Sequence, residues 1–364
     1  MTISRLAVRG VRARAVAAPM QRALATSTGA VSVAPLLLID LQTDAGIVGR
    51  SYLFGIARNN LAPLKALVQA MADLLKGDAL SPFEIEKKLR ARYTLLGVHN
   101  IVLFAMAGID MAAWDALGQA FGQPLVRLLG GAPRPVPAYN SMGLGILPLR
   151  KLAREAEELV KEGFWAVKLR LGRPRAEDDL DAVRAVKKAV GGNITLMVDF
   201  NQALSVNEAI KRGRMLDDEG GVCWIEEPVR ADDFAGCARV AREIATPIQL
   251  GENFMGPEQM AQALGAGASD FVMPDAQRIG GVTGWLRAAA LAQAAGLEMS
   301  SHLFPEASAH LLAVTPTCHW LEYVDWADPV LEAPLEHSVG HVLVPERPGL
   351  GMRWNEKAVK RYAL

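Results

Sequence analysis

The feature that most constrains the fold is a series of short apolar runs, each ending in one or two polar residues. Eight such runs follow one another between Val136 and Val324, and the polar residues lie 20 to 31 positions apart. This spacing accommodates one strand, one helix and two turns. The polar residues are Ser141, Lys168 with Arg170, Asp199 with Asn201, Glu226, Glu252, Asp275, His302 and Glu322. Eight such units predict a (β/α)-barrel, whose reactive groups lie at the carboxyl ends of its strands.

Composition narrows the classes of protein to which the chain can belong. Of 364 residues, 51% are hydrophobic and 21% are charged, which supports a large buried core rather than disorder. The 39 basic and 39 acidic side chains cancel without forming a basic stripe or an acidic tail. Nucleic acids and anionic membranes are therefore not expected as partners.

Three features of the sequence predict a cytoplasmic location. The chain has only three cysteines and no CxxC spacing, which is typical of a reducing compartment. Arginines interrupt the apolar residues of the N-terminus, so no signal-peptide core forms. The most apolar later stretch, IVLFAMAGIDMAAW, contains Asp110 and is too short to span a bilayer, so it predicts a buried helix.

We predict three parts from the change of pattern along the chain. Residues 1–131 combine strands with helices, and we expect an α+β capping domain there, with the Ser/Thr/Gly-rich residues 23–29 as a loop between strands. Residues 132–325 alternate strands and helices as a barrel does. The Pro/Gly-rich residues 326–364 are expected to return to the capping domain. The fold class is thus α/β, a modified (β/α)-barrel with an N-terminal cap.

Asp199, Glu226 and Glu252 end three successive strands, 27 and then 26 residues apart. Neighbouring strand ends meet on one rim of a barrel, so the three carboxylates are expected to converge and to repel one another. A divalent cation relieves that repulsion, and oxygen ligands favour Mg²⁺, with Mn²⁺ as a variant. The alternative is that each acid is paired with a lysine or arginine of the barrel.

Lys168 and Arg170 are two positions apart on one strand and therefore point to the same face, which we expect to be the barrel interior. A pair of cations can hold a substrate carboxylate, and a lysine whose pKa is lowered by its neighbour can serve as a base. The alternative is a surface strand with solvated cations. The flanking apolar residues favour the interior.

Asp275 and His302 end consecutive strands, and a carboxylate bonded to one imidazole nitrogen raises the basicity of the other. This pair predicts a general base. Glu322 ends the last strand and could act as a protonated acid that donates a hydrogen bond to developing negative charge. A salt bridge at the barrel end explains Glu322 equally well. The glycines of RIGGVTGW at 278–285 favour a βα turn over a phosphate site, because the P-loop lysine is absent.

Together these residues resemble the enolase superfamily, in its mandelate racemase subgroup. The resemblance rests on APLLLIDL, GIDMAAWDALG, VDFNQ, WIEEP, MPDAQRIGGVTGW, MSSHLF, SAHLLA and HWLE, which extend over nearly the whole chain. It implies an α+β cap on a barrel that ends early, a small carboxylate substrate and a homo-oligomer.

The resemblance also implies a role for each site residue. Asp199, Glu226 and Glu252 would bind Mg²⁺, and Asp275 with His302 would remove an α-proton. Glu322 would bond to the substrate carboxylate as it becomes an enediolate, and Lys168 would neutralise that carboxylate. The implied substrate contacts are Ser141, Asn201, Leu24, Thr28, Val31 and Phe54.

Arg170 departs from the pattern that the resemblance implies, in which a second lysine is the base on the opposite face. A guanidinium stays charged in proteins, so Arg170 can clamp a carboxylate but is a poor base. We therefore expect one base, His302, and favour dehydration of an acid sugar. Racemisation or epimerisation of a mandelate-like acid is the alternative within the class. A barrel that only binds an acid metabolite is the alternative outside it.

Overall fold

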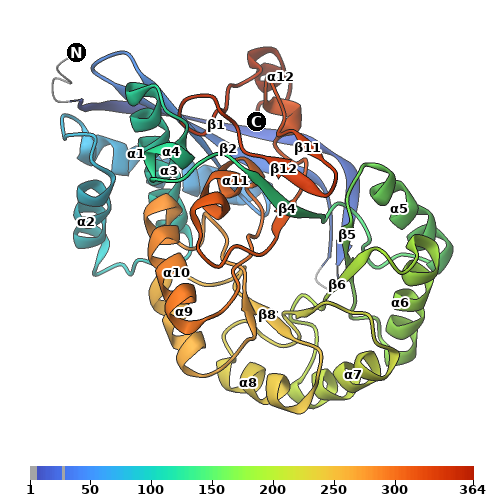
Figure 1. Ribbon diagram of the computed structural model, residues 1–364. Helices are drawn as coiled ribbons and strands as arrows, with labels where there is room; N and C mark the ends of the chain where they lie inside the picture. Colours follow the sequence, from blue (N-terminus) through green and yellow to red (C-terminus); the bar gives the residue numbers. More distant parts are fainter. Residues whose placement is uncertain (1–5, 27–28) are drawn as a thin grey trace.

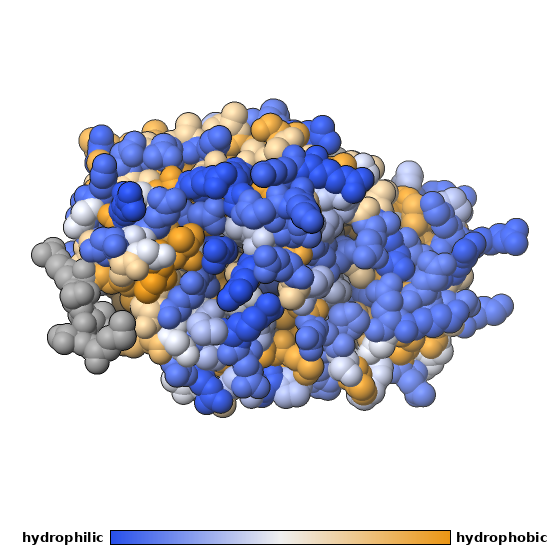
Figure 2. All heavy atoms as spheres, turned by 90° about the horizontal axis from the view of Figure 1, so that it is seen from above, coloured by the Kyte–Doolittle hydropathy of each residue, from blue (hydrophilic) through white to orange (hydrophobic). Residues whose placement is uncertain are grey.

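The computed structural model describes residues 6–26 and 29–364 and divides into a cap and a barrel. Figure 1 shows the helices of the barrel as a ring around its strands, with the cap sheet and helices beside one end of the ring. The chain passes from the cap into the barrel and then returns to the cap, so that the C-terminus lies close to the N-terminal strands. One face of the molecule is mostly hydrophilic, with apolar residues in small separate patches (Figure 2).

The cap is built on a three-stranded antiparallel sheet in the order β1-β2-β3. Its strands are β1 (Val8–Thr26), β2 (Gly29–Thr43) and β3 (Val48–Phe54). The predicted loop at 23–29 is wrong for residues 23–26, which continue β1, and for Gly29, which begins β2. Leu24 pairs with Val31 and Ala25 with Ala30, so this segment is one arm of a long hairpin. Cross-strand pairing supplies its backbone hydrogen bonds, and local composition did not reveal that partner.

Several helical segments complete the cap. They are η1 (Arg58–Asn60), α1 (Leu61–Leu75), α2 (Pro82–Tyr93), α3 (Ile101–Phe121) and α4 (Leu125–Leu128). Helix α3 is the predicted apolar helix, and it alone among the described helices is long and apolar enough to cross a membrane. Of its most apolar window, 78% is buried inside the protein. It is therefore the core helix between the cap sheet and the barrel.

The barrel strands are parallel and follow one another in chain order around the sheet. They are β4 (Pro135–Asn140), β5 (Ala166–Arg170), β6 (Thr195–Asp199), β7 (Ile225–Glu226), β8 (Ile248–Leu250), β9 (Phe271–Val272) and β10 (Leu321–Tyr323). Between β9 and β10, single parallel bridges from Met299 to Val272 and Cys318 occupy the seventh strand position. β10 pairs with β4 and closes the ring.

A helix follows each of the first seven strand positions and packs outside the ring (Figure 1). These helices are α5 (Leu149–Lys161), α6 (Ala176–Val190), α7 (Val206–Glu219), α8 (Phe234–Glu243), α9 (Pro257–Gly265), α10 (Gly281–Ala295) and α11 (Pro305–Val314). The arrangement is the modified (β/α)-barrel with an N-terminal cap that the sequence predicts.

The segment after β10 contacts both parts. It contains η2 (Asp328–Val330), β11 (His337–Ser338), β12 (His341–Leu343) and α12 (Glu356–Arg361). β12 pairs with the barrel strand β4, whereas Trp354 donates a hydrogen bond to Asp40 of the cap at 2.7 Å. The final residues also bond to β1, through Leu364 N–H to Ala15 O at 3.0 Å. The tail thus ties the barrel edge to the cap.

Candidate active site

The predicted site residues meet in a cavity of about 180 Å³ where the cap hairpin covers the carboxyl ends of the strands. Its polar floor comes from the barrel, and most of its apolar wall comes from the cap. The predicted residues that line it are Lys168, Arg170, Asp199, Asn201, Glu252, Asp275, His302, Glu322, Leu24, Val31 and Phe54. Glu226 and Ser141 are buried beneath this lining, and Thr28 lies outside the described residues.

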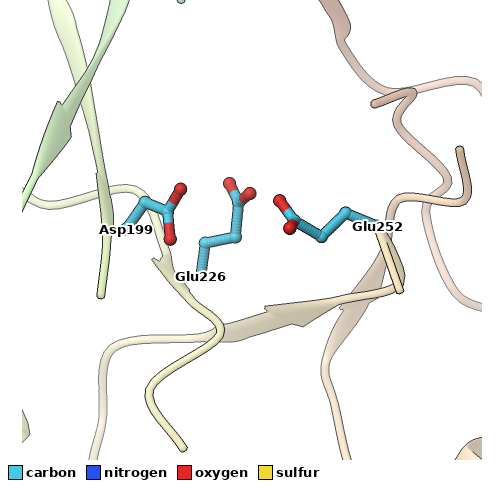
Figure 3. A group of neighbouring side chains, drawn as sticks. All are labelled: Asp199, Glu226 and Glu252. Atoms are coloured by element: carbon cyan, nitrogen blue, oxygen red, sulfur yellow. The ribbon is translucent and has the colours of Figure 1, made fainter. Parts of the chain in front are cut away.

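Asp199, Glu226 and Glu252 converge as predicted. One carboxylate oxygen from each lies within 4.8 Å of the others, and Figure 3 shows the three carboxyl groups turned toward one point. Burial raises the pKa of Asp199 and raises that of Glu226 well above its ordinary value, and neighbouring carboxylates add to both shifts. Burial also opposes ionisation of Glu252, but His302 and Lys168 outweigh it and lower its pKa. This cluster of hard oxygen donors has the ligand chemistry of a Mg²⁺ site.

Local backbone geometry sets the direction of two of these acids. After β6, Asn201 takes a left-handed conformation with φ 45°, and its N–H donates to Asp199 Oδ1 at 2.8 Å. Asparagine tolerates that region better than most residues. Gly251, with φ 140°, precedes Glu252, and a Cβ there would lie 2.8 Å from Met273 N. Only glycine fits this turn, which brings Glu252 to the rim.

Lys168 lies among the carboxylates, and its Nζ is 2.8 Å from Glu226 Oε1 and 2.8 Å from Glu322 Oε1. Asp199 Oδ2 is 3.5 Å away. Burial alone would lower the pKa of Lys168, but these carboxylates outweigh it and raise the pKa well above its ordinary value. The idea of a lysine with a lowered pKa is therefore wrong here. Lys168 therefore carries a fixed positive charge. This fits the alternative in which a lysine of the barrel pairs with the buried acids.

Arg170 points into the barrel as predicted but is held by hydrogen bonds. Its Nη1 donates to Ser141 O at 2.8 Å and to Gly143 O at 2.9 Å, and its Nη2 donates to Ser141 Oγ at 2.7 Å. The residue is 4% exposed. These contacts fix the guanidinium as a brace between β5 and the loop after β4.

The surroundings of Glu322 favour an ionised carboxylate over a protonated acid, the two alternatives that the sequence left open. Burial would raise its pKa, but Lys168, His302 and Arg170 lower the pKa well below its usual range. Its oxygens accept hydrogen bonds from Ser141 Oγ at 2.6 Å and from Leu303 N–H at 2.9 Å. The salt bridge that was the alternative reading is what forms, because the cation on β5 is directly opposite.

His302 and Asp275 form the predicted pair. His302 Nδ1 lies 2.8 Å from Asp275 Oδ2, and a parallel bridge joins the two backbones. The other nitrogen, Nε2, lies 3.3 Å from Glu252 Oε2. Burial would lower the pKa of His302, but Glu252, Glu322 and Asp275 raise it. With Nδ1 committed to Asp275, Nε2 is the atom available for proton transfer.

The sequence analysis missed several residues at the site. Glu227 is buried and accepts a hydrogen bond from Asn253 Nδ2 at 2.7 Å. The same Asn253 amide donates to Glu252 Oε1 at 3.1 Å. Glu227 and Asn253 thus help to hold Glu252, one of the predicted metal ligands. The doubled acid in WIEEP was the available signal. Further cavity residues are Thr26, Ile56, Gln277, Arg278, Leu303 and Trp326. Trp326 belongs to the segment that we assigned to the tail.

The glycine-rich turn at 278–285 is a βα turn, as favoured. It leads into α10, whose Thr283 N–H donates to Asp110 Oδ2 of α3 at 3.0 Å. A carboxylate of the cap thus occupies the helix N-terminus that a phosphate would need.

Comparison with known proteins agrees with this geometry. Residues 8–130 match the N-terminal domain of the mandelate racemase/muconate lactonizing enzymes, and residues 151–358 match the enolase C-terminal domain-like family. The chain belongs to the mandelate racemase/muconate lactonizing enzyme family of the enolase superfamily. It is 32% identical over 328 residues to L-talarate/galactarate dehydratase of Salmonella typhimurium, covering 89% of this chain and 81% of that protein.

Two further relatives match nearly the whole chain. D-galactarolactone cycloisomerase of Agrobacterium fabrum is 32% identical over 352 residues, covering 90% of this chain and 91% of that protein. The crystal structure of an enolase from Bradyrhizobium, complexed with magnesium and mandelic acid, has a TM-score of 0.96, 45% identity and 100% coverage of both chains. Other relatives are named as dehydratases, epimerases and racemases. The chain is thus an enzyme of the lyase or isomerase class.

Proposed function

We propose that this enzyme uses Mg²⁺ to remove the α-proton of a 2-hydroxycarboxylate and then dehydrates it, with His302 as the only base. The observation that carries the proposal is the immobilised guanidinium of Arg170, whose three short hydrogen bonds keep it away from proton transfer. Dehydration of an acid sugar requires one base, whereas racemisation requires a donor or acceptor on each face.

The convergent carboxylates support the metal requirement. Asp199, Glu226 and Glu252 present oxygen ligands in a buried cluster, and solved relatives contain magnesium. Bound Mg²⁺ would supply the positive charge that stabilises negative charge developing on the substrate carboxylate.

The residues around the metal site would hold the substrate carboxylate. Lys168 carries a permanent positive charge beside the ligands, and Glu322 is held opposite it. Asn201 lines the cavity and could contact a substrate oxygen. Because the Ser141 hydroxyl is already engaged by Glu322 and Arg170, we assign Ser141 to positioning them rather than to the substrate.

The proton route follows from the His302–Asp275 pair. Nε2 would accept the proton from C2 while Asp275 holds Nδ1 and stabilises the imidazolium. The imidazolium would then return a proton to the hydroxyl on C3, the C3–O bond would break, and water would leave. The resulting enol tautomerises to a 2-keto-3-deoxy acid. Atoms and charge balance over the reaction, because the proton taken from C2 leaves with the C3 hydroxyl as water.

A second candidate, racemisation of a mandelate-like acid, is favoured by the cavity wall. Leu24, Val31, Phe54, Ile56, Leu303 and Trp326 form an apolar lining beside the base. Such a wall suits an aryl or alkyl tail better than a chain of hydroxyls. The Bradyrhizobium relative complexed with mandelic acid supports this alternative.

The two candidates are separated by incubating the enzyme with Mg²⁺ and a panel of acid sugars and aryl hydroxy acids in deuterated buffer. Formation of a 2-keto-3-deoxy acid, with solvent deuterium entering from one face, is the expected result. Loss of optical activity without keto-acid formation would instead establish racemisation. Binding of an acid without any α-exchange would leave the binding-only barrel.

We propose domain boundaries at 1–131, 132–325 and 326–364, a homo-oligomer, and a cytoplasmic location. The free state of Cys223, Cys237 and Cys318 supports a reducing compartment.

A further inference from the structure

Gln277 joins the cap wall of the cavity to the loop that carries the base. It is 2% exposed, and both ends of its side-chain amide bond to the backbone of Phe54 at the end of β3. Its Oε1 accepts the Phe54 N–H at 2.8 Å, and its Nε2 donates to the Phe54 carbonyl at 3.3 Å. The amide thus pairs with the strand end as a backbone peptide group would.

The same residue also holds the catalytic pair. The Gln277 N–H donates to Asp275 Oδ1 at 2.8 Å, while Asp275 Oδ2 is bonded to His302 Nδ1 at 2.8 Å. On the other side, the Phe54 ring lines the cavity and packs on Trp326 with ring centroids 5.1 Å apart. One buried residue therefore links the apolar wall to the catalytic pair: its side chain makes two hydrogen bonds to Phe54, and its backbone N–H makes one to Asp275.

We propose that Gln277 is a positioning residue that determines specificity by fixing the distance between the Phe54 wall and His302. This inference rests on the proposed function, in which His302 abstracts the α-proton. The tail of a substrate contacts the wall while its C2–H must meet Nε2. If the wall can move relative to the base, the enzyme no longer discriminates between substrates by their tails. Misplacement of the reacting atoms by about 1 Å already reduces the rate strongly.

The structure supplies a matched control in Tyr52, two residues earlier on β3. Its hydroxyl donates to Glu306 Oε2 of α11 at 2.6 Å, so it is also a buried hydrogen bond between cap and barrel. Its hydroxyl bonds to Glu306 rather than to Asp275, and Tyr52 does not line the cavity. Gln277→Met and Tyr52→Phe each remove a cap-to-barrel contact at nearly constant volume, but only the first loosens the wall against the base.

The test compares an acid with a large apolar tail, mandelate, with lactate, which has only a methyl group. Affinities are measured calorimetrically with Mg²⁺, and α-exchange is measured in deuterated buffer. We expect Gln277→Met to reduce the mandelate-to-lactate ratio of both quantities about tenfold or more, and Tyr52→Phe to leave it unchanged. An equal loss for both acids, or an unchanged ratio, overturns the proposal.

Amide hydrogen exchange of Phe54 provides a readout that does not need activity. We expect its protection to fall in Gln277→Met and to persist in Gln277→Glu, which keeps an acceptor for the Phe54 N–H. Unchanged protection in Gln277→Met overturns the proposal even where the wild type exchanges no α-proton. Absence of α-exchange with every acid, combined with lost protection, would reject the proposed function and leave only the positioning of the Phe54 wall by Gln277.

Discussion

Arg170 and Ser141 are joined by two hydrogen bonds, from Nη1 to the serine carbonyl at 2.8 Å and from Nη2 to its hydroxyl at 2.7 Å. Ser141 Oγ in turn donates to Glu322 at 2.6 Å. A guanidinium with several fixed donors suits this bracing role, whereas an ammonium group cannot reproduce the planar fork. This bracing role is consistent with the proposed one-base chemistry, in which the second cation on β5 takes no part in proton transfer.

Replacing Arg170 with lysine should introduce a second base. Lysine releases the planar contacts to Ser141 and, unlike arginine, can be neutral in a protein. We expect Arg170→Lys to incorporate deuterium from the opposite face at least about tenfold faster than Arg170→Met. Chiral analysis of the substrate recovered from deuterated buffer measures this. Equal incorporation by the two variants would show that Arg170 does not determine the number of bases.

Removing the proposed base should abolish exchange without affecting the metal site. Asparagine at position 302 can still approach Asp275 but cannot accept the α-proton. We expect His302→Asn to slow α-exchange by about 10²–10⁴-fold, with stabilisation by Mg²⁺ retained. The exposed His99 offers a control, since His99→Asn should change neither quantity. Exchange persisting in His302→Asn would mean that another group is the base.

Metal binding should be visible as stabilisation of the folded protein. At a Mg²⁺ concentration about 100 times Kd, binding to the folded state alone adds about 2.7 kcal/mol and should raise Tm by roughly 2–4 °C. Asp199→Asn removes one anionic ligand of the cluster and should eliminate most of this shift. Thermal unfolding with EDTA and with Mg²⁺ measures it. A full shift in the variant would place the ion elsewhere.

Asp328, a half-buried acid of the segment after β10, should make stability depend on pH. Burial, with help from Glu306 and Asp325, raises the pKa of Asp328 from its ordinary value of 3.8 to about 8. The folded state therefore keeps a proton that the unfolded chain releases, so stability falls as pH rises between these two values.

Asp328→Asn should remove this loss. The variant should gain little over the wild type near pH ~4 and roughly 2–4 kcal/mol above pH ~8, as measured by urea unfolding at several pH values. Asp232, an exposed residue paired with Arg230, provides the control, because Asp232→Asn should give no pH-dependent gain of this sign. A gain for Asp328→Asn that is independent of pH would contradict the raised pKa.

The spacing of polar residues along the chain was sufficient to predict the barrel and its metal cluster. The proximity of Asp199 and Glu226 could be predicted from their spacing, because a parallel barrel brings consecutive strand ends together whatever the details of packing. The same rule placed Asp275 beside His302. The long hairpin of β1 and β2 was not evident, because the pairing of Leu24 with Val31 depends on a cross-strand partner rather than on local pattern.

The sequence by itself thus determined the architecture, the convergence of the carboxylates and the partners of the base, all of which follow from strand order and side-chain alternation. Only the tertiary structure decided the charge states and contacts within that frame. Lys168 is a fixed cation because Glu226 and Glu322 both reach it. Gln277 matters because β3 of the cap ends beside it. Such effects depend on distances of about 3 Å between residues far apart in the chain, and only packing sets those distances.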